Sequence, residues 1–160
     1  MLAQKAFMTA PPKNIPDNFP ATGPLLGLDL GTKTIGIAIC DPARSLATPV
    51  TVIQRTKFTK DAEALLALAE TRGVTGLVLG LPYNMDGSEG PRAQSTRAFA
   101  RNLSQLTELP IMFWDERLST AAAEDDLIAQ GMRREKRAKI IDAIAASHIL
   151  QSALDGLREA

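Results

Sequence analysis

Three runs of alternating apolar residues follow one another early in the chain, and the links between them are too short to contain a helix. The runs occupy residues 25–30, 35–39 and 48–54. Such alternation is typical of strands, and strands joined by short links pair antiparallel. The sequence therefore predicts an antiparallel meander of three strands.

Helical and strand-like patterns alternate over the rest of the chain. Helices are expected over 61–72, from Pro91 onward, over 119–130 and over 138–157, and strands over 76–81 and 111–114. This order matches the RNase H-like topology. It predicts an α/β fold with a mixed sheet, in which two parallel strands follow the three antiparallel strands and helices cover both faces.

The predicted domain does not begin at the first residue. Residues 1–24 contain five prolines and few regularly spaced apolar side chains, which indicates a flexible tail. A single domain is expected over residues 25–157, with residues 158–160 as the C-terminal end. A chain of 160 residues suffices for one well-buried core and would be cramped for two.

Composition limits the chemistry that this chain can carry. Lys and Arg total 18, as do Asp and Glu, so any attraction to nucleic acid must be local. Cys40 and His148 are the only residues of their types, so a metal site would depend on oxygen ligands, which favour Mg²⁺ or Mn²⁺. The chain lacks a hydrophobic run of membrane-spanning or signal-peptide length, so we expect a cytoplasmic protein without membrane contact.

Asp29 interrupts the first apolar strand, where it alternates with Leu28 and Leu30. A carboxylate near the covered face of a sheet is costly without a partner. Gly31 and Gly36 leave open space beside it for a backbone, a phosphate or a metal. Two roles fit Asp29: a turn residue that accepts backbone hydrogen bonds before Gly31, or a member of a functional site.

Asp115 and Glu116 end the last predicted strand. Adjacent side chains on a strand point to opposite faces, so at most one of the two joins a site with Asp29 unless the strand has already bent. A solvated strand end, in which Arg117 neutralises its neighbour, is the alternative.

Asp142 lies among apolar residues of the last predicted helix. A surface ion pair with Lys139 is one explanation for it. The other is a site in which carboxylates from three segments hold two divalent cations, one activating water and one stabilising the leaving oxygen of a phosphodiester.

The dense basic cluster of the chain precedes this helix. It consists of Arg133, Arg134, Lys136, Arg137 and Lys139. The cluster is suited to phosphate binding, and a solvated linker is the alternative. Arg97 and Arg101 share a helix face and are either further phosphate contacts or ordinary surface charges.

Four sequence blocks occur in order between residues 25 and 157: LGLDLGTKTIGIAI, GLPYNMDGSEG, WDERLST and DAIAASHIL. Together they resemble the YqgF (RuvX) family of metal-dependent nucleases. The resemblance implies an RNase H-like nuclease, related to Holliday junction resolvases, that processes the 5′ end of pre-16S rRNA in ribosome biogenesis. It also implies that Asp29, Glu116 and Asp142 are catalytic and bind two Mg²⁺ or Mn²⁺ ions, with Asp115 as the alternative to Glu116.

The same resemblance extends to substrate binding. Lys33, Arg117, Ser119 and Thr120 match polar family positions and are expected to contact phosphates. From the basic cluster, Arg133, Arg134 and Arg137 are added to this set. The expected partner is nucleic acid, pre-16S rRNA or branched DNA, in a ribosomal precursor particle in the first case, and the protein is expected to be a monomer or a homodimer.

Two other functions fit parts of the sequence. The block LDLGTKTIG also resembles the phosphate-binding hairpin of sugar kinases and actin-like ATPases, but those proteins close two domains around ATP. The basic cluster suits a non-catalytic RNA-binding protein of ribosome assembly, whose RNA affinity would survive Asp29→Ala. RNA and branched DNA share the same reactive linkage, so the catalytic residues leave a Holliday junction resolvase open as well.

Overall fold

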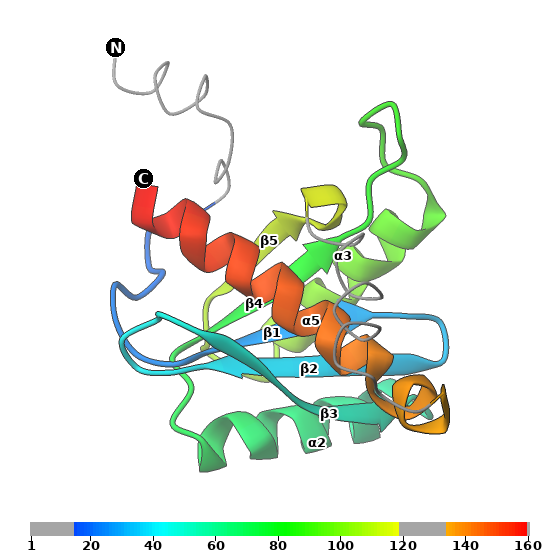
Figure 1. Cartoon of the computed structure of the whole chain (residues 1–160), viewed down its shortest axis with the longest axis horizontal. Coiled ribbons are helices and arrows are strands. Elements are labelled where there is room, and N and C mark those ends of the chain that lie inside the picture. The colour runs from blue at the N-terminus through cyan, green and yellow to red at the C-terminus, as the bar shows by residue number, and fades with distance from the viewer. Residues whose placement is uncertain (1–14, 119–133, 160) are drawn as a thin grey trace.

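The computed structural model describes residues 15–118 and 134–159, and its centre is a five-stranded sheet in the order β3-β2-β1-β4-β5 (Figure 1). The strands are β1 (Leu25–Leu30), β2 (Thr34–Cys40), β3 (Ala47–Gln54), β4 (Gly76–Leu81) and β5 (Ile111–Asp115). β1, β2 and β3 pair antiparallel, whereas β4 and β5 run parallel to β1. The predicted fold class is confirmed.

Three α-helices and one short 3₁₀ helix accompany the sheet in the described residues. They are α2 (Phe58–Thr71), α3 (Pro91–Ser104), η1 (Glu116–Leu118) and α5 (Arg134–Glu159). α2 begins three residues before its predicted start, and α5 extends beyond both predicted ends. The helix predicted over 119–130 lies outside the described residues. None of the helices that the structure describes is long and apolar enough to cross a membrane.

The two faces of the sheet have separate cores. Leu26, Leu28 and Leu30 of β1 point to one face, where they pack with buried side chains of α2 and α3. On the other face, Leu25 and Val78 pack with the apolar side of α5. α5 crosses this face diagonally in Figure 1. Helices therefore cover both faces, and the polar side chains of β1 that alternate with its leucines face α5.

Glycines in the strands let α5 approach the sheet closely. A Cβ at Gly27 would lie 2.7 Å from the Cβ of Leu150, and one at Gly80 would lie 2.6 Å from Cδ1 of Ile149. At Gly36 an added Cβ would overlap the backbone oxygen of Asp142 itself. α5 is therefore held against β2 at Asp142 by backbone contact.

Residues 15–24, which the sequence places in a flexible tail, lie against the domain. Ile15 and Phe19 pack against the core beneath α5, and the guanidinium of Arg44 lies 5.9 Å from the ring centre of Phe19. The ring of Phe19 also covers the space beside Gly76 at the start of β4. An aromatic side chain gains enough from such burial to fix the segment that carries it.

Candidate active site

Asp29 lies near the end of β1, where its side chain points to the face that α5 covers. Its register partner is Gly36 of β2, the glycine that contacts the backbone of Asp142. Burial, a hydrogen bond to Glu116 and the negative charges of Glu116 and Asp142 raise the pKa of Asp29 to about 8, and Arg92 opposes this rise. A pKa of this size means that the group holds a proton unless a cation compensates its neighbours.

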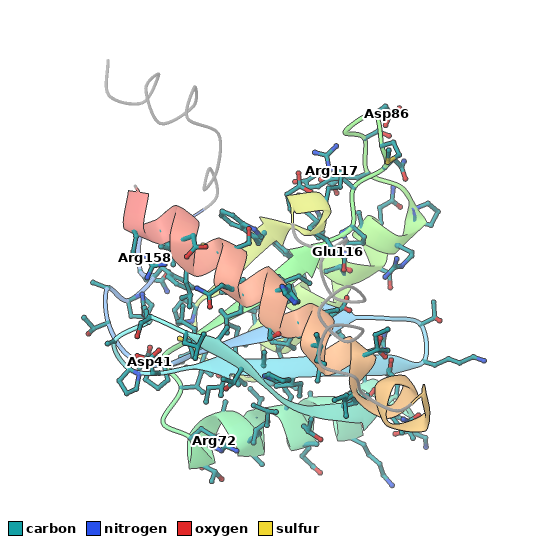
Figure 2. The ribbon with its side chains drawn as sticks, in the orientation of Figure 1. Asp41, Arg72, Asp86, Glu116, Arg117 and Arg158 are labelled. Atoms are coloured by element: carbon teal, nitrogen blue, oxygen red, sulfur yellow. The ribbon has the colours of Figure 1, made fainter. Side chains whose placement is uncertain are left out.

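Glu116, and not Asp115, is the carboxylate that contacts Asp29. The strand β5 ends at Asp115 and the 3₁₀ helix begins at Glu116, so the alternation of strand side chains stops between them. Asp115 instead accepts hydrogen bonds from Arg117, with Nη2 of Arg117 at 2.6 Å from Oδ2. Figure 2 shows Arg117 beside the loop with Asp86 at its tip, while Glu116 lies closer to the sheet.

Asp142 joins the same site from α5. Its Oδ2 accepts a hydrogen bond from the hydroxyl of Thr34, the first residue of β2. Asp29, Glu116 and Asp142 thus interact across three elements that are far apart in the sequence. The three carboxylates that the family resemblance implies as a set therefore lie close enough to interact.

The donor atoms of this cluster suit a hard divalent cation, because all of them are carboxylate oxygens. Within residues 15–118 and 134–159, no three Asp, Glu, His or Cys side chains converge tightly enough to hold a metal ion as they stand. Asp29 and Glu116 share a hydrogen bond, and the Asp142 carboxylate is engaged by Thr34. A divalent cation fits the chemistry of the cluster, since it would replace the shared proton and relieve the repulsion.

The predicted substrate-binding residues have different surroundings. Lys33 is exposed in the turn between β1 and β2. Arg117 is held by Asp115, by the backbone oxygen of Asn84 at 3.3 Å, and over the ring of Tyr83. These contacts join the end of β5 to the loop over residues 82–90, so Arg117 stabilises this part of the fold.

The other predicted substrate contacts are only partly described. Ser119, Thr120 and Arg133 lie outside the described residues. Arg134 and Arg137 belong to the first turns of α5, but their side chains are also outside the description. Arg97, the weaker candidate, makes a bidentate ion pair with Glu89 at 2.7 Å and lies over the ring of Phe113.

Two arginines that the sequence patterns do not indicate lie at the end of β1. Arg92 opposes the rise in the pKa of Asp29, and its Nη2 donates to the backbone oxygen of Leu30 at 3.2 Å. Arg55 donates to the backbone oxygen of Gly31 at 2.6 Å. The sequence holds one signal for Arg92. A cation in the first turn of a helix interacts unfavourably with the positive end of the helix dipole, so an arginine at that position indicates a role other than helix stability.

The order and direction of the strands, with helices on both faces and the carboxylates at the end of the central strand, define an RNase H-like nuclease fold. The structure is similar to T. thermophilus RuvC in complex with Holliday junction substrate, with a TM-score of 0.57, 11% identity, and coverage of 86% of this chain and 97% of that one. The yeast mitochondrial Holliday junction resolvase gives a TM-score of 0.54 with 13% identity, covering 89% and 82%. At these identities the likeness shows the fold.

The chain belongs to the RuvX family, whose model, described as a Holliday junction resolvase, matches residues 23–156. A protein of Paracoccus denitrificans is 66% identical over 139 residues, which cover 87% of this chain and 88% of the relative. One of Rhodopseudomonas palustris strain BisA53 is 69% identical over 139 residues, covering 87% and 85%. Both relatives carry the name "Putative pre-16S rRNA nuclease". The family and the fold place the protein among the nucleases, which confirms the resemblance seen in the sequence.

Proposed function

We propose that this protein is a metal-dependent endonuclease that hydrolyses a phosphodiester bond near the 5′ end of pre-16S rRNA. The observation that carries the proposal is the meeting of Asp29, Glu116 and Asp142 at the end of β1, where the pKa of Asp29 rises to about 8. Three interacting carboxylates at a half-buried position do not stabilise a fold, because their charges repel one another. They suit a nuclease, because carboxylates bind the cations that neutralise the charge developing on phosphate oxygens.

The three carboxylates would bind two Mg²⁺ or Mn²⁺ ions. When bound, these ions neutralise charge on the reacting phosphate and make a proton easier to remove from water. Thr34 orients the carboxylate of Asp142, and the backbone contact at Gly36 fixes the height of α5 over Asp29. Arg92, close enough to affect the pKa of Asp29, adds positive charge at the edge of the site, where the substrate backbone enters.

RNA and branched DNA share the reactive linkage, and RNA is favoured because the two relatives reported above carry the name "Putative pre-16S rRNA nuclease". The substrate would be a ribosomal precursor in the cytoplasm, bound by a monomer or a homodimer. The family model is described as a Holliday junction resolvase, so branched DNA is the second candidate substrate.

The proposal is tested by incubating a pre-16S 5′-leader RNA and a four-way DNA junction with the full chain, in Mg²⁺, Mn²⁺ or EDTA. Asp29→Asn and Asp142→Asn are compared with Asp155→Asn, an exposed aspartate of the same helix as Asp142. We expect metal-dependent cleavage of the RNA by the wild type and by Asp155→Asn, and a loss of at least about a hundredfold in the other two variants.

Each other outcome selects a different function. Metal-dependent cleavage of the junction alone, lost in the same two variants, would replace the RNA nuclease by a resolvase. RNA binding without cleavage in any metal, unchanged by Asp29→Asn, would show a non-catalytic RNA-binding protein. Cleavage that Asp29→Asn leaves intact would refute the proposed site while leaving a nuclease.

A further inference from the structure

A pocket of about 160 Å³ opens beside the candidate active site, where β1 ends and α3 begins. Its walls combine the β1–β2 turn, the link after β3 and the first two turns of α3. Its lining includes Leu30, Arg55, Arg92, Ser95 and Phe99. Leu30 and Asp29 are neighbours on one strand and point to opposite faces, so the pocket and the carboxylates flank the same strand end from its two sides.

Two guanidinium groups are fixed in the wall of this pocket. Arg55 donates to the backbone oxygen of Gly31 at 2.6 Å, and its guanidinium carbon lies 5.6 Å from the ring centre of Phe99. Arg92 donates to the backbone oxygen of Leu30 at 3.2 Å. Each contact uses part of a group that has five N–H donors, so both arginines keep donors for a ligand while their own freedom is already reduced.

Both charged side chains that line this pocket are positive, those of Arg55 and Arg92. None of its lining residues is acidic. The first turn of α3 carries no acidic residue, and its N-cap is Gly90, which supplies no side-chain hydrogen bond. The positive end of the helix dipole therefore adds to the two guanidinium charges. The hydroxyl of Ser95 supplies a further donor at the same rim.

We propose that this pocket binds the non-bridging oxygens of a backbone phosphate that neighbours the phosphodiester being cut. This inference rests on the proposed nuclease function, and it identifies how the nucleic acid is held across the end of β1. A nucleic acid that crosses the end of β1 contacts the carboxylates on one side and the two arginines on the other. Arg92 hydrogen bonds to the backbone oxygen of Leu30 in the pocket and is close enough to Asp29 to affect its pKa. It therefore lies between the pocket and the carboxylates.

A phosphate suits the pocket better than a base. Planar, multiple N–H donors match phosphate oxygens, and phosphate contacts fix the position of a strand without reading its sequence. A stacked base would need an exposed aromatic face, but the ring of Phe99 is only 5% exposed and belongs to the core under α3.

The first test is binding of a fluorescent pre-16S 5′-leader RNA in EDTA, followed by anisotropy over a series of salt concentrations. Arg92→Gln is compared with Arg72→Gln, an exposed arginine at the C-terminal end of α2 that does not line the pocket. We expect Arg92→Gln to weaken binding about tenfold and to lower the salt dependence by about one phosphate contact, while Arg72→Gln changes both far less. Equal effects in the two variants would overturn the proposal.

The second test uses RNAs in which one linkage near the cleavage site is an uncharged methylphosphonate, or one base is removed. One methylphosphonate should weaken RNA binding by the wild type and by Arg72→Gln, yet leave binding by Arg92→Gln nearly unchanged, because that variant has already lost the contact. Coupling of Arg92 to a missing base instead, or to no linkage at all, would refute phosphate binding. Both tests measure binding without metal, so a protein that binds as described but never cleaves would refute the proposed function alone.

Discussion

Asp29 shows how a strand residue acquires unusual chemistry from its neighbours. Its side chain faces α5, where it forms a hydrogen bond with Glu116 and lies near the negative charge of Asp142. The partner is Glu116 and not Asp115 because of the residue at which β5 ends. The structure ends β5 at Asp115, which Arg117 then engages.

Without metal, the stability of the protein is expected to fall as the pH rises from about 4 to about 8. The pKa of Asp29 lies near 8 in the folded chain against 3.8 ordinarily, so the folded state binds the proton more tightly and loses this advantage across that interval. Asp29→Asn removes the effect and should be more stable than the wild type at pH 8.

This expectation is checked by urea unfolding in EDTA at pH 5 and pH 8. Asp155→Asn, whose carboxylate is exposed, should keep the pH dependence of the wild type. If the free energy of unfolding changed equally between pH 5 and pH 8 in the wild type and in Asp29→Asn, burial and the acidic neighbours would not destabilise the ionised group.

Thr34→Val is expected to lower cleavage about tenfold, because it removes the hydrogen bond that orients the Asp142 carboxylate. Thr34→Ser keeps the hydroxyl and should stay close to the wild type. Initial rates over a Mn²⁺ titration separate weaker metal binding from slower turnover. Equal rates for the valine and serine variants would contradict an orienting role.

At the scale of elements, periodicity predicts every strand of the sheet and the three α-helices that the structure describes, but not the 3₁₀ helix η1 that brings Glu116, rather than Asp115, to Asp29. Short links place β1, β2 and β3 side by side, whereas β4 pairs with β1, from which it is far removed in the sequence. The pocket of Arg55 and Arg92 could not be predicted either, because Arg55 follows β3 and Arg92 lies in α3, and the two meet only in the folded chain. Sequence spacing carries no information on such a meeting.

The contact of α5 with the strands should respond differently at two glycines. Gly36→Ala would drive a Cβ into the backbone oxygen of Asp142, which cannot move without α5, so we expect a loss of about 3 kcal/mol of stability and most of the cleavage. Gly80→Ala meets only the flexible end of Ile149 and should cost about 1 kcal/mol. Thermal unfolding and cleavage rates measure both, and a larger loss for Gly80→Ala would contradict this account.

At the scale of the whole molecule, the described N-terminal segment closes one end of the core beneath α5. Phe19→Ala should lower the free energy of unfolding by about 2 kcal/mol, because its ring packs on that core and beside Gly76. Leu46, which is 61% exposed, offers the control, and Leu46→Ala should change stability by less than about 0.5 kcal/mol. Equal values in denaturant unfolding would mean that the segment contributes nothing to the fold.

The absence of a side chain at position 36 determines the distance between two carboxylates. Gly36 pairs with Asp29 in the sheet and contacts the backbone of Asp142 in α5, so a single peptide unit separates the backbones that carry these two side chains. A different residue at position 36 would therefore change the distance between these two carboxylates while leaving both carboxylates in the chain.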